Sequence, residues 1–207
     1  MIDIHIIPAP GNEVSFNAQL ERLKHPLVNT IIGEYVAGNI LEARYRAFSQ
    51  GTSPYVSWVD DDDKILDLSW LPKALETLED PGVAAVYPRW RSTLFGRVFD
   101  ETSREAFTPA RYLFQTASFS PHHLTIMRRE NVMECLNRLR ERHPKTLSIQ
   151  ERYLVISQLR YGRIVKDDTL AYEWVLRQGT GRQMLDTTAV REFMRIETLE
   201  SLACWQE

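Results

Sequence analysis

The sequence predicts an α/β fold in which a mostly parallel sheet is flanked by helices. Apolar or alternating runs at 2–7, 27–32 and 55–59 have the length and composition of strands. The segments between them, at 17–24 and 38–49, carry apolar residues at helical spacing. Strands that alternate with helices in this way are typical of parallel sheets, and in particular of the nucleotide-binding kind.

The ends of these elements carry residues that stop regular structure. Ile2, Ile4 and Ile6 alternate along the first strand, which we expect to end at Pro8. The second helix is expected to end at Gly51, because glycine is favoured just after a helix.

The second half of the chain is expected to continue the same architecture. Asp67 or Ser69 is expected to cap a helix that carries Pro72 in its first turn, and Pro88 is expected to stop the strand that follows that helix. The long irregular segment 89–121 is a candidate binding loop. The other expected elements are a strand at 83–87, a strand at 124–127, a helix at 130–142, a helix ending at Gly162, strands at 163–165 and 170–176, and a helix from about 187.

The composition is that of one folded domain. The chain has 207 residues, of which 43% are hydrophobic, and a net charge of −3 that gives no global attraction for nucleic acid. The two cysteines, Cys135 and Cys204, are far apart and are expected to be reduced, buried thiols of a cytoplasmic protein. The early acid Asp3 argues against a signal peptide, and no segment approaches the roughly 20 apolar residues of a membrane span.

Four consecutive carboxylates, Asp60 to Asp63, follow the central strand. Open α/β sheets bind ligands at the carboxyl ends of their strands. Adjacent carboxylates repel one another, so a divalent cation that carries phosphate oxygens is a natural counter-charge. The alternative is a solvated acidic loop that also caps the next helix.

Three stretches, in order, resemble glycosyltransferase family 2 and its GT-A fold. They are Ala43-Arg44-Tyr45; Val59-Asp60-Asp61-Asp62-Asp63 with Leu71-Pro72 and Pro81-Gly82; and Gln150-Glu151 with Leu154 to Gly162, Ile164-Val165 and the strand around Tyr172 and Trp174. The resemblance covers residues 1 to 182. It departs from the family at Gln150, which replaces the first member of an acidic pair, and at Gln178, which replaces a histidine.

The resemblance implies a nucleoside-diphosphate sugar donor and a divalent cation, Mn²⁺ or Mg²⁺. It places Asp62 on the metal and Asp60 nearer the ribose, and an alternative register makes Asp62 and Asp63 the working pair. The residues that it assigns to nucleotide-sugar binding are Pro8, Ala9, Glu34, Arg44, Asp60 and Asp61, and those that it assigns to the metal are Asp62 and Asp63. For Arg44, the alternative is a surface ion pair with Glu42 or Glu34.

Glu151 is the candidate general base. It lies at or just before the start of an apolar helix, where unpaired backbone N–H groups favour an ionised carboxylate. Such a group can take the proton of an acceptor hydroxyl during direct displacement with inversion. The alternative is an ordinary glutamate that stabilises the first turn of its own helix.

We therefore expect one metal-dependent glycosyltransferase domain of GT-A type over residues 1–207, with a nucleotide-binding half at 1–87, an acceptor-side half at 88–182 and a C-terminal helix at 183–207. The acceptor hydroxyl belongs to a small molecule, a glycan or a hydroxymethylated base in DNA, and a basic excess at 128–145 permits the last. Two other functions stay open: a nucleotidyltransferase and a non-catalytic nucleotide-sugar-binding module.

Overall fold

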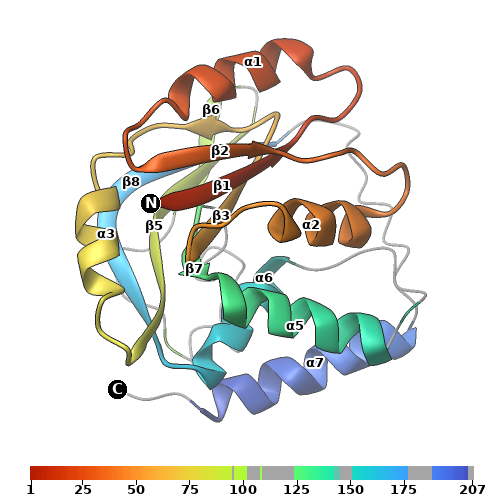
Figure 1. Ribbon diagram of the computed structural model, residues 1–207. Helices are drawn as coiled ribbons and strands as arrows, with labels where there is room; N and C mark the ends of the chain where they lie inside the picture. The colour runs from red at the N-terminus through yellow and green to blue at the C-terminus, as the bar shows by residue number, and fades with distance from the viewer. Residues whose placement is uncertain are drawn as a thin grey trace.

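The computed structural model contains a mixed sheet that runs through the centre of the molecule (Figure 1). The structure describes residues 1–94, 96–101, 108, 124–142, 144, 151–176 and 188–204. Within these residues the sheet has eight strands in the order β2-β1-β3-β7-β5-β8-β4, and β6 pairs with β5. The strands are β1 (Ile2–Ile7), β2 (Val28–Ile32), β3 (Tyr55–Asp60), β4 (Lys64–Ile65), β5 (Val83–Leu94), β6 (Arg97–Glu101), β7 (Ile126–Arg128) and β8 (Arg163–Leu176).

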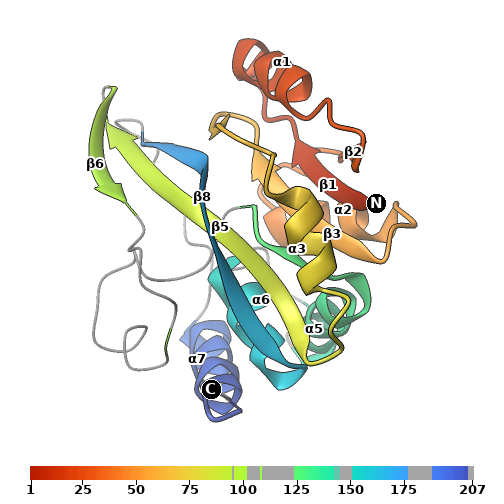
Figure 2. The same cartoon turned by 90° about the vertical axis from the view of Figure 1, so that its left-hand side faces the viewer.

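Parallel pairing joins β1 to β2, β1 to β3 and β5 to β8, and these three ladders hold most of the paired residues. Figure 2 shows β5 and β8 running side by side along the sheet. The β3–β7, β5–β7, β4–β8 and β5–β6 pairs are antiparallel. Because β1, β2 and β3 are parallel, their carboxyl ends meet at one edge of the sheet. The predicted α/β architecture with a mostly parallel sheet is confirmed.

Helices cover both faces of the sheet (Figures 1 and 2). Helices α1 (Glu13–Arg22) and α3 (Leu71–Thr77) flank a core built on Ile4 and Val59. The opposite core is built on Trp58 and Leu136. It is covered by α2 (Ile40–Ser49), α5 (Arg129–Arg142), α6 (Glu151–Ile156), the 3₁₀ helix η2 (Ser157–Arg160) and α7 (Thr188–Leu202). None of the helices within the described residues has the length and hydropathy needed to cross a bilayer.

The alternation along β1 continues into the core, although its polar residues are also buried. Ile2, Ile4 and Ile6 pack into the core beneath α1 and α3, while Asp3 and His5 are fully buried as well. The Asp3 carboxylate is satisfied by an ion pair with Arg129 and by hydrogen bonds from the side chains of Ser53 and Asn29. β1 is therefore covered on both faces of the sheet, where a buried charge requires partners.

Two strands are longer than the sequence predicts. β5 passes through Pro88 to Leu94, and β8 is one strand where two were expected. The ladder between β5 and β8 shifts register on both sides of Arg89, so the missing N–H of Pro88 falls at an irregularity where proline is tolerated. The prediction that Pro88 stops the strand is therefore wrong.

Three other local predictions are also wrong. No side chain caps α3, and the Asp67 carboxylate instead accepts a hydrogen bond from the backbone N–H of Ser69. Helix α1 begins at Glu13 and not at residue 17. Cys135 is buried as expected, but Cys204 is exposed in the turn that follows α7.

Candidate active site

The four aspartates form a turn, called here the acidic turn (Asp60 to Asp63), at the carboxyl end of β3. Asp60 is the last residue of the strand and is in register with Ile7 of β1. The backbone N–H of Asp63 donates to the carbonyl oxygen of Asp60 over 3.4 Å, which closes the turn. The acidic turn therefore stands at the edge of the sheet where β1 and β2 also end, as the sequence predicts.

The carboxylate of Asp60 forms an ion pair with the buried guanidinium of Arg44. The Nη2 of Arg44, on α2, lies 2.6 Å from Oδ1 of Asp60. The Arg44 side chain is 3% exposed and that of Asp60 is 35% exposed, so a buried guanidinium is paired with a carboxylate that solvent can reach. Arg44 also lies over the ring of Trp58, 5.9 Å from its centroid. The alternative that Arg44 pairs with Glu42 or Glu34 at the surface is wrong, because Arg46 makes both of those contacts.

Asp61 turns away from Asp60 and fixes the loop that follows β1. Its carboxylate accepts the backbone N–H of Ala9 at 2.6 Å and the side-chain amide of Asn12 at 3.2 Å. Burial raises the pKa of Asp61, and these two hydrogen bonds oppose the rise. Asp61 therefore connects the acidic turn to the first loop of the chain.

Asp63 is buried and turns toward β8. Its Oδ2 accepts a hydrogen bond from the hydroxyl of Tyr172 at 2.8 Å, and its Oδ1 accepts the backbone N–H of Val175 at 2.8 Å. Burial raises the pKa of Asp63 well above its usual range, and the nearby carboxylate of Asp60 raises it further. The sequence allows two assignments of the aspartates. The assignment that uses Asp63 as a metal ligand requires a buried carboxylate that already accepts two hydrogen bonds.

Asp62 is half-buried, between two buried neighbours. It follows the partly exposed Asp60 in the acidic turn, at the edge of the sheet. No group of three or more His, Cys, Asp or Glu side chains with metal-binding geometry occurs within the described residues. Mg²⁺ and similar hard cations prefer one or two carboxylates plus substrate phosphates to a cage made of protein alone. The donor set therefore fits a cation that binds together with a diphosphate.

Gln19 is a residue of this region that the sequence did not single out. It is 1% exposed on α1. Its Nε2 donates to the carbonyl oxygen of Asp60 at 3.3 Å and its Oε1 accepts the N–H of Ile65 at 3.1 Å, so one side chain spans the acidic turn. A single glutamine in a helix carries no sequence signal for this role, and neither does Asn12.

The other predicted nucleotide contacts lie on the same edge of the sheet. Pro8 and Ala9 are half-buried just after β1, and both the N–H and the C=O of Ala9 are engaged within the protein. Glu34 follows β2 and is 68% exposed, and its carboxylate lies 3.0 Å from Arg46. The assignment of these three residues to the nucleotide stays a prediction.

The described part of helix α6 spans Glu151–Ile156, so Glu151 is helical, and its place at the start of the helix stays a prediction. The Glu151 side chain, together with Gln150 and Gln178, lies outside the described part of the structure. Its role as a general base stays a prediction.

The basic residues near 128–140 are engaged within the protein. Arg128 donates to the carbonyl oxygens of Leu78 and Asp80, and Arg129 pairs with Asp3. The remaining contacts are Arg138 with Glu134 and Glu197, and Arg140 with Glu42 and the ring of Tyr45. These contacts give no support to a basic stripe for DNA.

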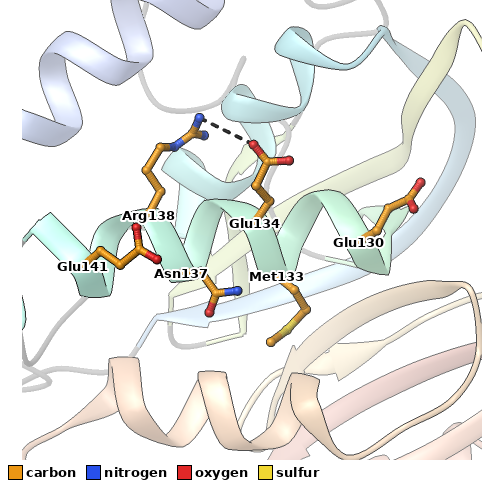
Figure 3. Close-up of a pocket in the computed structure, with 6 residues that line it drawn as sticks. All are labelled: Glu130, Met133, Glu134, Asn137, Arg138 and Glu141. Atoms are coloured by element: carbon orange, nitrogen blue, oxygen red, sulfur yellow. Dashed lines mark ion pairs between the residues drawn. The ribbon is translucent and has the colours of Figure 1, made fainter.

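A separate hollow of about 490 Å³ lies along the outer side of α5. Figure 3 shows its lining residues projecting from that one helix, with Arg138 paired to Glu134. The lining residues are Glu130, Met133, Glu134, Asn137, Arg138 and Glu141. None of them belongs to the acidic turn or contacts it, so we do not assign this hollow to the candidate site.

Comparisons with known proteins agree with the resemblance seen in the sequence. Residues 35–136, which include α2 and the acidic turn, match the family model described as glycosyl transferase family 2. No curated protein matches the chain significantly.

Among solved structures, the chain is similar to TarS of S. aureus. Residues 1–349 of TarS in complex with UDP match with a TM-score of 0.65 and 14% identity, over 97% of this chain and 68% of that one. The same fragment in complex with UDP-GlcNAc matches with a TM-score of 0.60 and 14% identity, over 97% and 69%. A longer TarS structure matches with a TM-score of 0.61 and 13% identity, over 97% of this chain and 43% of that one. At this level of identity the likeness establishes the fold.

Proposed function

We propose that this chain transfers a sugar from a nucleoside-diphosphate sugar to an acceptor hydroxyl, because residues 35–136 match the glycosyl transferase family 2 model and the fold is similar to that of TarS. The observation that carries the proposal is the placement of the acidic turn. Asp60 and Asp62 present oxygen ligands at the carboxyl ends of three parallel strands, which is where open α/β sheets bind nucleotides.

Within this proposal, Asp62 is the cation ligand and Asp60 lies nearer the ribose. The cation, Mn²⁺ or Mg²⁺, supplies positive charge that stabilises the leaving diphosphate. Asp62 holds it, and Arg44 keeps the Asp60 carboxylate in one orientation, toward the ribose, through its ion pair. The loop at Pro8 and Ala9, fixed by Asp61, forms the adjoining wall.

Glu151 is the proposed general base, which takes the proton of the acceptor hydroxyl as that oxygen attacks the anomeric carbon. Direct displacement inverts the anomeric configuration. The first turn of a helix, where Glu151 is predicted to lie, leaves backbone N–H groups without helical partners, and these favour the ionised carboxylate that a base requires.

UDP is the first nucleotide to test, because the TarS structures were solved with UDP and with UDP-GlcNAc. We propose a reducing compartment such as the cytosol, because both cysteines are free thiols. Two classes of acceptor are to be compared. The first is simple sugars and glycans, and the second is duplex DNA with hydroxymethylated bases.

The deciding experiment incubates the protein with Mn²⁺ and a panel of UDP-, GDP- and dTDP-sugars, with each acceptor class. Release of nucleoside diphosphate that stops on addition of EDTA is the expected result. Release of pyrophosphate would instead indicate a nucleotidyltransferase, and tight binding without any release would indicate a binding module. NMR of the anomeric proton of the product tests inversion.

Two variants connect the activity to the site. Asp62→Asn is expected to abolish Mn²⁺-dependent release of diphosphate, because the variant lacks the charged cation ligand. Asp168→Asn is the matched control, since the side chain of Asp168 is 83% exposed and pairs with Lys166, two residues away on β8. Equal activity of both variants would contradict the assignment of Asp62.

A further inference from the structure

We propose that the Tyr172 hydroxyl is a positioning residue of the donor site, which holds the acidic turn so that Asp62 faces the cation, and that Asp63 is its structural partner and not a cation ligand. The inference rests on the proposed function, because it concerns the same site. It assigns the backbone N–H of Asp60 and the carboxylate of Asp63 to Tyr172 on β8, and it leaves the carboxylate of Asp62 for the cation.

The geometry at the Tyr172 oxygen carries the inference. The oxygen accepts the backbone N–H of Asp60 at 3.1 Å and donates to Oδ2 of Asp63 at 2.8 Å. One atom therefore joins the first residue of the acidic turn to the last. The distance between the ends of the turn, and with it the direction in which Asp62 projects, depends on this oxygen.

The oxygen itself has little freedom to move. Tyr172 is 0% exposed and its ring belongs to the core beneath α1 and α3. Its backbone is held on both sides, by β5 at Trp90 and by β4 at Ile65. A rigid ring that is packed between two strands can fix a flexible turn, because packed interiors leave few alternative rotamers.

Asp63 has both carboxylate oxygens turned to β8, one to Tyr172 and one to the backbone N–H of Val175. A cation ligand must give its lone pairs to the metal, and Asp63 is 4% exposed. Asp62, its neighbour, is half-buried at the edge of the sheet. The two adjacent carboxylates therefore serve different purposes.

The test compares Tyr172→Phe with Tyr55→Phe. Tyr55 lies in β3, and its hydroxyl donates to the Leu78 carbonyl at 3.3 Å, away from the acidic turn, which makes it a matched control. The first measurement is amide hydrogen exchange at Asp60 without any ligand. Tyr172→Phe should speed exchange at this amide about tenfold or more, because its acceptor is gone, while Tyr55→Phe should leave it unchanged.

The second measurement is the affinity for Mn²⁺ in the presence of UDP, by electron paramagnetic resonance or calorimetry. Tyr172→Phe is expected to weaken Mn²⁺ binding about tenfold while keeping its cooperative unfolding. Asp63→Asn should retain measurable Mn²⁺ binding, and Asp62→Asn should lose it. Loss of Mn²⁺ binding to the same degree in both Asp variants would make Asp63 a ligand and overturn the inference.

The outcomes separate this inference from the proposed function. If the wild-type protein binds Mn²⁺ with UDP, and Tyr172→Phe binds them equally well or leaves exchange at Asp60 unchanged, the positioning role alone is wrong. If the wild-type protein binds neither Mn²⁺ nor any nucleotide of the panel, the proposed function fails and the inference falls with it. Faster exchange together with weakened Mn²⁺ binding in Tyr172→Phe supports both.

Discussion

The guanidinium of Arg44 and the carboxylate of Asp60 lie 2.6 Å apart, the cation almost fully buried and the anion at the edge of the sheet. Arg44 comes from α2 and Asp60 from the end of β3, so the ion pair also fixes the helix against the strand. A buried guanidinium that is paired in this way holds the carboxylate in one orientation while leaving part of it accessible.

Replacement of Arg44 is expected to weaken donor binding. Arg44→Gln removes a charge-assisted hydrogen bond of about 1.5–3 kcal/mol and leaves Asp60 free to reorient. We expect the dissociation constant for UDP with Mn²⁺ to rise roughly tenfold to a hundredfold by calorimetry. Arg195→Gln on α7, where the arginine is exposed and pairs with Glu192, serves as the control. An unchanged UDP affinity in Arg44→Gln would show that the ion pair does not serve the donor site.

The sequence predicted the acidic turn but not what holds it. The place of Asp60 to Asp63 after a strand follows from local pattern, as does the place of Glu151 in a helix. Gln19 and Asn12 were missed because each makes contacts more than 40 residues away along the chain, and no local pattern reports such contacts. The different orientations of Asp61 and Asp63 are likewise set by tertiary partners on β8 and on the loop after β1.

The length of β5 is another feature that the local sequence pattern does not predict. Pro88 locally predicts the end of a strand, yet the long partner β8 continues the ladder on both sides of it. Pairing with a distant strand therefore overrides the local preference, and a register shift accommodates the proline.

Loss of the buried charge pair beneath α2 is expected to destabilise the fold. Asp3→Asn leaves Arg129, which is 16% exposed, without its anion. Breaking a buried pair by removing one partner costs about 3–5 kcal/mol. Urea denaturation should show this loss in the free energy of unfolding, whereas Asp168→Asn at an exposed site should change it by less than about 0.5 kcal/mol. A small effect of Asp3→Asn would mean that the hydrogen bonds from Ser53 and Asn29 suffice.

The two cysteines are expected to differ in reactivity. Burial raises the pKa of the Cys135 thiol by more than the hydrogen bond with the Ser157 hydroxyl, 3.1 Å away, lowers it, so little reactive thiolate forms. Cys204 is exposed. Titration of the native protein with Ellman's reagent should therefore modify one thiol rapidly and the second only after denaturation. Cys204→Ser should remove the rapid phase, and a rapid phase that survives in this variant would contradict the burial of Cys135.

His5 is expected to make the protein sensitive to mild acid. Its ring packs edge-on against Phe48, with centroids 4.7 Å apart, and neither ring nitrogen has a hydrogen-bond partner among the described residues. Burial is the largest of several effects that together lower the pKa of His5 from 6.5 to about 3. The charge of Arg129 is the next largest cause of this lowering, that of Arg44 adds to it, and that of Asp3 opposes it.

The direction in which pH changes the stability follows from the protonation of His5 in the folded and unfolded chains. Between pH 6.5 and about 3 the unfolded chain binds a proton at His5 and the folded chain does not, so acid favours unfolding. The stability is fully present above pH 6.5 and is lost as the pH falls toward the folded value. From pH 7 to pH 5 this one group should remove about 2 kcal/mol from the free energy of unfolding.

His5→Leu tests this directly, because leucine keeps an apolar side chain against Phe48 and cannot be protonated. Urea denaturation at pH 7, 6 and 5 should give a flatter pH profile for His5→Leu than for the wild-type protein. If His5→Leu loses as much stability as the wild-type protein between pH 7 and pH 5, the acid sensitivity arises elsewhere and His5 is not buried as a neutral ring.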